Sequence, residues 1–336
     1  MNISSLSKYA LAAVASASIL AACSGGQSGM GATGTMPSTA GGGNLMTEAV
    51  AHPMALNQPH SAGVIAPGKK GGSSYVYISG IYTNEVYVYN FAKGKFGTEV
   101  GTATSGISEP QGMCASKGNA WLANTGDSNL LEFKGGSTTS SGSLTDTGEY
   151  PADCSISKKG DIAVSNICSS PSCTQGDIAI FKGGTGSPTA VSCSNLYRYY
   201  FLAYDKKGNL WVDGEDSSGA FSFCEVAAGA SSGTPITLNV NPSFPGGVQV
   251  SGKYVTILDQ LGDTVDEYTI SGTTGTEAHT ITLSASGDDL VNDWFAGKYL
   301  LVSNLTTGQG DSFKKSGGSP YSTATASEAL GITLVK

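Results

Sequence analysis

The side chains best suited to chemistry in this chain are carboxylates from widely separated segments. Asp153 lies near the middle of the chain, whereas Asp289 and Asp293 lie near its end, together with Asn292. Carboxylate and amide oxygens are the ligands that Ca²⁺ prefers. The same residue types also cap turns and face water. The sequence therefore leaves two interpretations open for this set: a Ca²⁺ site, or turn residues exposed to solvent.

A second candidate site is the segment Tyr197, Arg198 and Tyr199, which contains the only arginine of the chain. Arginine offers planar hydrogen-bond donors, and tyrosine offers a flat amphipathic surface, so both are enriched where proteins bind partners. The segment is therefore a candidate binding site for a protein, a peptide or a glycan. The alternative is that the tyrosines pack in a core and Arg198 pairs with a nearby acid.

The positions of the histidines argue against several classes of enzyme. Only three are present: His52 and His60 precede the repeated part of the chain, and His279 begins an outer strand. A histidine base placed centrally is therefore not expected, which argues against lyases of the virginiamycin type and against Ser–His hydrolases. The Gly-Gly pairs follow lysines in hairpins and match no phosphate-binding fingerprint.

The elements that must position these residues are six repeats of short strands. Each repeat has a strand ending in an apolar residue, which recurs at intervals of 44, 42, 48, 46 and 44 residues, at Ile78, Leu122, Val164, Val212, Leu258 and Val302. An aromatic residue follows each of them, 10 or 11 positions later in five repeats and 17 later in the third, at Tyr89, Phe133, Phe181, Phe223, Tyr268 and Phe313. Within each repeat, apolar and polar residues alternate between Gly, Asn and Asp turns, which is typical of strands.

Four short strands repeated six times predict an all-β fold, a six-bladed β-propeller of four-stranded antiparallel blades over residues 61–336. Segments 109–112, 118–124 and 208–212 resemble those of the NHL-repeat and SMP-30-like six-bladed propellers. A tandem pair of β-sandwiches is the alternative. In a propeller, Asp153, Asp289 and Asp293 would lie near the mouth of the central channel. We expect residues 331–336 to form the fourth strand of the last blade, and ring closure then to rest on blade packing or on a strand from residues 45–58.

Six cysteines of the repeated region form an even set, which favours disulfides in an oxidising compartment. Cys168 and Cys173 enclose a short turn that contains a proline, and we expect them to pair. Cys114 and Cys154 lie at matching positions of adjacent innermost strands, and we propose that they pair across the blade boundary. This leaves Cys193 to pair with Cys224, one of 15 possible connectivities for six cysteines.

The N-terminal segment resembles that of bacterial lipoproteins. Residues 18–24 match the lipobox pattern, in which Cys23 is the lipidated residue, and a short apolar run precedes them. The resemblance implies a signal peptide over residues 1–22 and a lipid anchor to the membrane at Cys23. Residues 23–60 are rich in Gly, Ser and Thr and are expected to form a flexible tether. The expected location is the bacterial cell envelope, at the outer membrane in a Gram-negative host.

The net charge of −8 and the lack of basic runs argue against nucleic acid as a partner. The sequence therefore predicts a lipid-anchored β-propeller that binds an envelope protein, peptide or glycan without catalysis and without a cofactor other than Ca²⁺. The alternative is a metal-dependent lactonase or hydrolase. SMP-30-like lactonases hold their metal with Glu, Asn and Asp on separate blades, but the segments typical of that site are missing here.

Overall fold

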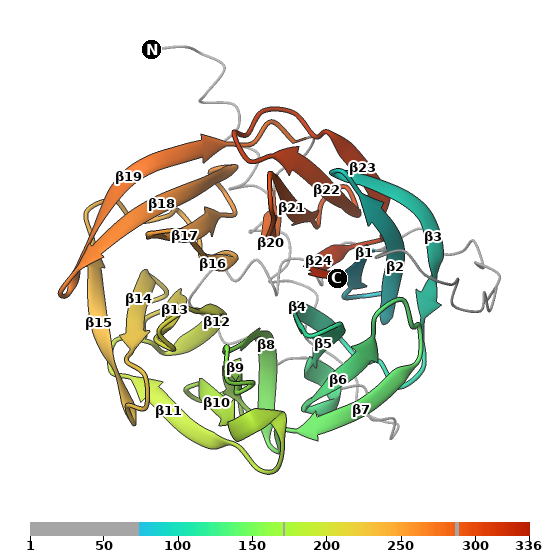
Figure 1. Cartoon of the computed structure of the whole chain (residues 1–336). Coiled ribbons are helices and arrows are strands. Elements are labelled where there is room, and N and C mark those ends of the chain that lie inside the picture. The colour runs from blue at the N-terminus through green and yellow to red at the C-terminus, as the bar shows by residue number, and fades with distance from the viewer. Residues whose placement is uncertain (1–73, 171, 286–288) are drawn as a thin grey trace, which may run out of the picture. The chain divides into compact units, whose positions relative to one another are not determined.

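The computed structural model describes residues 74–170, 172–285 and 289–336 (Figure 1). The predicted signal peptide (1–22), the lipidation site Cys23 and the predicted tether (23–60) lie outside these residues, as do residues 61–73. No helix among the described residues is long and apolar enough to cross a membrane. Two short 3₁₀ turns interrupt the strands, η3 (Thr125–Asp127) and η4 (Lys182–Gly184).

The described residues form 24 strands that pair as six successive groups of four, which we call sheets 1 to 6. Sheet 1 contains, from the first to the fourth strand, β24 (Ala329–Val335), β1 (Ser74–Gly80), β2 (Glu85–Ala92) and β3 (Lys95–Ala103). Sheet 2 contains β4 (Pro110–Ser116), β5 (Asn119–Asn124), β6 (Asn129–Lys134) and β7 (Ser140–Thr145). Sheet 3 contains β8 (Glu149–Ile156), β9 (Ile162–Ser169), β10 (Asp177–Phe181) and β11 (Thr189–Cys193).

The other three sheets follow the same order along the chain. Sheet 4 contains β12 (Arg198–Tyr204), β13 (Leu210–Glu215), β14 (Phe221–Val226) and β15 (Ser232–Leu238). Sheet 5 contains β16 (Val248–Ser251), β17 (Tyr254–Asp259), β18 (Thr264–Ser271) and β19 (Thr274–Thr282). Sheet 6 contains β20 (Leu290–Ala296), β21 (Tyr299–Asn304), β22 (Gln309–Lys314) and β23 (Ser322–Thr325).

The sheets are arranged around one axis. Their first strands contact one another in turn, in the order β24, β4, β8, β12, β16, β20 and back to β24 (Figure 1). Pairing within each sheet is antiparallel, whereas short parallel pairings join the outer strands β11, β15 and β19. This arrangement rules out the tandem β-sandwiches, in which two sheets would pack face to face.

The ring is closed by the C-terminal strand, which corrects the sequence-based expectation. Residues 331–336 do not complete the last repeat. Instead β24 pairs with β1, with Leu334 opposite Val76 and Ile332 opposite Ile78, and becomes the first strand of sheet 1. The terminal strands therefore share one sheet, so the main-chain hydrogen bonds between them join the two ends of the ring.

The two recurring positions of the repeat have clear structural roles. The six aromatic residues all lie on third strands and are buried. The residue after each recurring apolar position often links neighbouring sheets. Ser79 is an example: its Oγ accepts from the Gly331 N–H at 2.7 Å and donates to the Gln111 carbonyl of the next sheet at 2.5 Å. Ser165 and Ser303 make the same two contacts in sheets 3 and 6.

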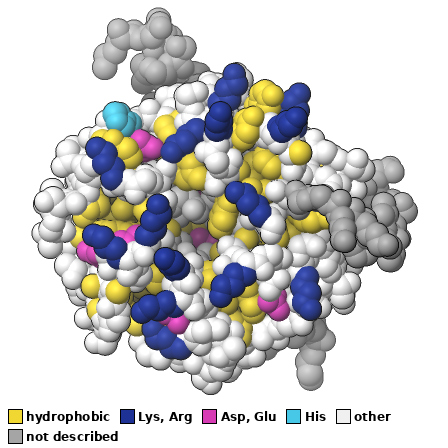
Figure 2. Space-filling view, viewed as in Figure 1, with side chains coloured by type: hydrophobic (Ala, Val, Ile, Leu, Met, Phe, Trp, Pro, Cys, Tyr) yellow, Lys and Arg dark blue, Asp and Glu magenta, His cyan; other side chains and the backbone are white. Residues whose placement is uncertain are grey.

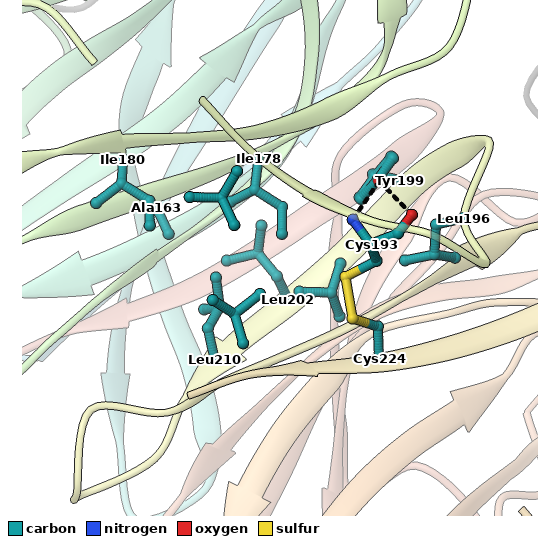
Figure 3. Packing of buried hydrophobic residues seen from close by; sticks show 12 residues of the cluster. Ala163, Ile178, Ile180, Cys193, Leu196, Tyr199, Leu202, Leu210 and Cys224 are labelled. Atoms are coloured by element: carbon teal, nitrogen blue, oxygen red, sulfur yellow. Dashed lines mark hydrogen bonds between the residues drawn. A yellow bond between two sulfur atoms is a disulfide. The ribbon is translucent and has the colours of Figure 1, made fainter. Parts of the chain in front are cut away.

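The structure contains the three predicted disulfides. Cys114–Cys154 joins β4 to β8, Cys193–Cys224 joins sheets 3 and 4, and Cys168–Cys173 closes the loop after β9. Figure 3 shows the apolar core between sheets 3 and 4, in which Ile178, Ile180, Leu202 and Leu210 belong to the same cluster as the Cys193–Cys224 disulfide. Two of the disulfides therefore join neighbouring sheets, 2 to 3 and 3 to 4, and the third lies within sheet 3.

Charged side chains divide between the two faces of the ring. Because successive strands are antiparallel, the turn between the first two strands and the turn between the last two lie at the same edge of each sheet. Every lysine of the described residues lies in or beside these turns or directly after β24: Lys93, Lys95, Lys117, Lys134, Lys158, Lys159, Lys182, Lys206, Lys207, Lys253, Lys298, Lys314, Lys315 and Lys336. We call this face, which Figure 2 shows, the lysine face.

The opposite face consists of the remaining turns and the links between sheets. Among the described residues it carries Arg198 as its only cation. Its acids are Glu85, Glu109, Asp127, Asp146, Glu149, Asp177, Glu215, Asp216, Asp259, Asp263, Asp289 and Glu328. Although the net charge of the chain is −8, the charges are unevenly distributed, with lysines on one face and these carboxylates on the other.

Candidate functional site

The predicted acidic set separates into two locations. Asp153 on β8 and Asp293 on β20 are buried, and both lie on first strands near the axis. Asp289 instead is half-buried in the turn before β20, where it accepts a hydrogen bond from the Thr306 hydroxyl at 2.9 Å. The structure therefore brings together two of the three predicted carboxylates and places the third in a turn on the opposite face.

A third buried carboxylate, which sequence reasoning treated only as part of a strand end, accompanies Asp153 and Asp293. Asp213 takes the place of the linking serine in sheet 4, and its two oxygens accept the Phe201 N–H at 2.9 Å and the Gly246 N–H at 3.2 Å. Burial raises the pKa of all three carboxyls well above the ordinary range. The charge of Asp153 raises the pKa of Asp213 and Asp293 further, so the three groups lie near one another.

The predicted Tyr197–Tyr199 segment lies at the start of sheet 4, on the opposite face. Arg198 is 7% exposed; its Nη1 donates to the Thr174 carbonyl at 2.8 Å and its Nη2 to the Cys173 carbonyl at 3.2 Å. The half-buried Tyr197 ring lies 4.5 Å from the guanidinium carbon. Arg198 thus holds the disulfide loop against sheet 4.

Tyr199 lies in the core between sheets 3 and 4 (Figure 3). Its side chain is fully buried, and its hydroxyl accepts the Cys193 N–H at 2.8 Å and donates to the Cys193 carbonyl at 3.1 Å. These contacts fix the end of β11 beside the Cys193–Cys224 disulfide. Binding of a ligand by this segment stays a prediction, because the geometry shows only its structural contacts.

The clearest recess on the described surface is a groove of about 430 Å³ between sheets 3 and 4, on the lysine face. Its floor is apolar, and its side chains come from β10 to β14: Ile180, Val191, Tyr204, Leu210 and Val226. Five lysines line it, at the turns of both sheets: Lys158, Lys159, Lys182, Lys206 and Lys207. We call this recess the lysine groove.

The charges of the lysine groove are mostly not neutralised within the chain. Lys182 pairs with Asp161 at 3.6 Å, and this is the only ion pair within 4.0 Å among the described residues. The floor belongs to the same core as the Cys193–Cys224 disulfide, so its shape is fixed before a ligand arrives. An apolar floor beneath free ammonium groups is suited to a ligand that is both acidic and apolar.

The sequence does not reveal this groove through a continuous basic run, because the groove lysines are scattered along the chain. The signal present was a recurring Lys-Gly pair at turns, at residues 93–94, 117–118, 134–135, 159–160, 182–183 and 207–208. Each of these turns lies on the same side of its sheet once the strand order is known. The order of the strands therefore brings together lysines that are far apart in the sequence.

Comparisons with known proteins define the fold. No protein-family model matches the chain, and no curated protein matches it. A chain in the crystal structure of a nidogen/laminin complex has a TM-score of 0.64 and 9% identity, covering 78% of this chain and 98% of that chain. A protein of unknown function from Bacteroides caccae has a TM-score of 0.57 and 11% identity, covering 79% of this chain and 100% of that chain.

This likeness, together with the strand order, identifies the protein as a β-propeller. At such low identity it shows the fold alone, and propellers perform many unrelated functions. The lactonase alternative receives no support from these neighbours. A function must therefore be argued from the surface of this chain.

Proposed function

We propose that the chain is a six-bladed β-propeller, with sheets 1 to 6 as its blades, and that it acts as a non-catalytic binding module. Its partner in this proposal is an acidic segment of another protein, which contains apolar side chains and binds in the lysine groove. One of the similar structures is that of a nidogen/laminin complex, which is consistent with protein binding by this fold.

The proposal rests on one feature of the lysine groove, an apolar floor surrounded by lysines. Apolar side chains of the ligand would remove the floor from water, at about 25 cal/mol per Å² of buried apolar surface. Its carboxylates would meet lysines that have no described acid within 4.0 Å, apart from Lys182. Such rim charges mainly accelerate association and select the partner, and their effect weakens as salt is added.

We further propose that the chain is a lipoprotein of the bacterial envelope, with Cys23 as its lipidated residue and residues 23–60 as its tether. The resemblance of residues 18–24 to a lipobox supports this part of the proposal. Ser74, the first described residue, begins β1 at the edge of sheet 1 that belongs to the lysine face. A membrane anchor upstream of β1 would therefore favour partners that approach close to the membrane.

The binding proposal is tested with a defined probe, a fluorescent ten-residue peptide in which Glu alternates with Leu. A variant with four groove lysines replaced by glutamate (Lys158, Lys159, Lys206 and Lys207) should bind this peptide at least tenfold more weakly than the wild type. The loss should shrink at high salt. Fluorescence anisotropy measures both affinities.

The matched control changes the same number of charges on the same face but in sheets 1 and 6, at Lys93, Lys95, Lys298 and Lys314. We expect this control to lose less than threefold in affinity. Equal losses in both variants would show that only diffuse charge matters. Failure of the wild type to bind the peptide, or binding to anionic phospholipid vesicles in its place, would overturn the proposal of an acidic protein partner.

A further inference from the structure

The axis of the ring holds a group of buried polar side chains that the proposed function does not use. Asp153, Asn292 and Asp293 are exposed by 3%, 2% and 0% and come from sheets 3 and 6. The Asn292 side chain hydrogen-bonds Asp153, and Asp153 and Asp293 lie close enough to repel one another. These three residues, which we call the axial cluster, therefore converge from two sheets.

The axial cluster contains oxygen atoms without a hydrogen-bond partner among the described residues. These atoms are Oδ1 of Asp153, Oδ1 of Asn292 and both carboxylate oxygens of Asp293. On neighbouring first strands, the Gln111 amide and the Thr333 hydroxyl are buried and also lack described partners. A buried polar atom without a partner costs about 1 to 3 kcal/mol, and more when it is charged. A single bound group that contacts several of these oxygens would remove this cost.

The neighbouring glycines leave room for these oxygens. A Cβ atom at Gly112 would lie 2.3 Å from Oδ1 of Asp153, and a Cβ atom at Gly247 would lie 2.4 Å from Oδ1 of Asp293. Any other residue at either position would displace the carboxylate. Glycine at these two positions thus keeps both carboxylates in place at the axis.

A proton alone does not satisfy this arrangement. A proton on Asp293 would satisfy at most two of the four oxygens, the one that carries it and the one that accepts from it. Asp213 is held differently, because each of its oxygens already accepts a backbone N–H, and it is therefore not part of the axial cluster. A cation, in contrast, can bind several oxygens together and neutralises the repulsion between the carboxylates.

We propose that Asp153, Asn292 and Asp293 bind a divalent cation on the axis of the ring, and that the cation is Ca²⁺. The donors are all oxygen atoms, and two carboxylates match its charge, which is the pattern of Ca²⁺ sites and not of zinc sites. Within the described residues no three His, Cys, Asp or Glu side chains form a metal-binding group, so the Asn292 amide is a necessary ligand of the proposed site. Water or main-chain carbonyls supply the remaining ligands.

Such a cation would link sheets 3 and 6 across the axis and so stabilise the ring. This role is independent of the lysine groove. The test uses the full-length chain stripped with EDTA and then dialysed against Ca²⁺, Mg²⁺ or Zn²⁺. The wild type should bind one Ca²⁺ per chain, and its melting temperature should rise by roughly 5 °C at a hundredfold excess over Kd.

Variants locate the site. Asp153→Asn and Asp293→Asn each keep the side-chain shape and remove one charge, so each should weaken Ca²⁺ binding at least tenfold. The control Asp127→Asn removes an exposed carboxylate of the opposite face and should bind Ca²⁺ as the wild type does. Peptide binding in the lysine groove should be unchanged in all three variants.

The outcome for the wild type decides the proposal even if a variant fails to fold. Absence of bound Ca²⁺ at millimolar concentration would overturn it, as would unchanged Ca²⁺ affinity in both axial variants. A preference for Zn²⁺ over Ca²⁺ would contradict the oxygen-only site. Because peptide binding is measured separately, failure of the cation site leaves the proposed function standing, and the reverse also holds.

Discussion

The two faces of the ring differ in how their charges are used. On the lysine face, one ion pair, between Lys182 and Asp161, lies within 4.0 Å among the described residues. On the opposite face, carboxylates are engaged in the fold: Asp177 accepts from the Asn166 amide at 2.8 Å, and Asp216 accepts the N–H groups of its own turn. Charges on the lysine face are therefore available to a partner, whereas those on the opposite face hold turns and loops.

Both faces are formed by the turns of the same six sheets, so both depend on the pairing of β24 with β1 that closes the ring. Deleting residues 329–336 removes β24, which contains five buried apolar side chains, and leaves the edge of β1 unpaired. We expect the free energy of unfolding to fall by more than about 5 kcal/mol, because each large buried side chain contributes about 1.5 to 3 kcal/mol. Deleting Lys336 alone should change it by less than about 0.5 kcal/mol. Urea titration measures both, and a stable, cooperative truncated chain would contradict closure by β24.

Arg198, the one cation of the opposite face in the part of the chain that the structure describes, sharpens the comparison. Arg198→Ala removes the hydrogen bonds to two loop carbonyls, and we expect it to destabilise the protein by about 2 to 4 kcal/mol, because hydrogen bonds to charged groups contribute about 1.5 to 3 kcal/mol. Lys117→Ala on the lysine face is the control and should cost less than about 0.5 kcal/mol. Thermal unfolding of both variants measures the difference. Equal stabilities would show that Arg198 is free to serve a ligand.

The acids of the opposite face predict a smaller, pH-dependent effect. Burial raises the pKa of Asp146 to about 6 and that of Glu149 to about 7. The unfolded values are near 4, so the folded state binds protons more tightly. The resulting stabilisation is complete below about pH 4 and is lost as the pH rises through 6 and 7. The melting temperature should therefore be higher at pH 5 than at pH 8.

Glu149→Gln tests which group causes this dependence. The variant keeps the contact with the Ser169 hydroxyl but cannot ionise, so its melting temperature should change less between pH 5 and pH 8 than that of the wild type. A matched control, Glu132→Gln, makes the same exchange at a half-buried glutamate of β6 and measures the effect of the exchange itself. If Glu149→Gln and the wild type respond equally to pH, then Glu149 does not contribute.

The sequence predicted the strands and the Cys168–Cys173 disulfide because both follow from local spacing, whereas Cys114–Cys154 followed from matching positions in the repeat and Cys193–Cys224 by elimination. Alternation of residues marks each strand, and Cys168 and Cys173 are five residues apart on one loop. Closure by β24 was not predictable in this way, because an apolar terminal strand has the same pattern whichever sheet it joins. The two ends must meet in space before Leu334 can lie opposite Val76.

The candidate sites were predictable only in part, for similar reasons. Asp153 and Asp293 could be placed near the axis because they follow the start of a first strand. Asp289 precedes its strand and adopts a left-handed backbone with a φ of 74°, which turns it away into a loop. The orientation of Arg198 depends on carbonyls of a distant disulfide loop, and the lysine groove depends on strand order. Sequence alone reveals neither.

The central claim is that the lysine groove is the binding surface, and acetylation of lysines in the presence of the Glu-Leu peptide tests it most directly. After brief reaction with an acetylating reagent, mass spectrometry gives the rate of modification of each lysine. We predict at least fivefold protection of Lys158, Lys159, Lys206 and Lys207 by the peptide, with no protection of Lys298 across the ring. Uniform protection of all lysines, or protection of Lys298 alone, would contradict a specific role for the groove.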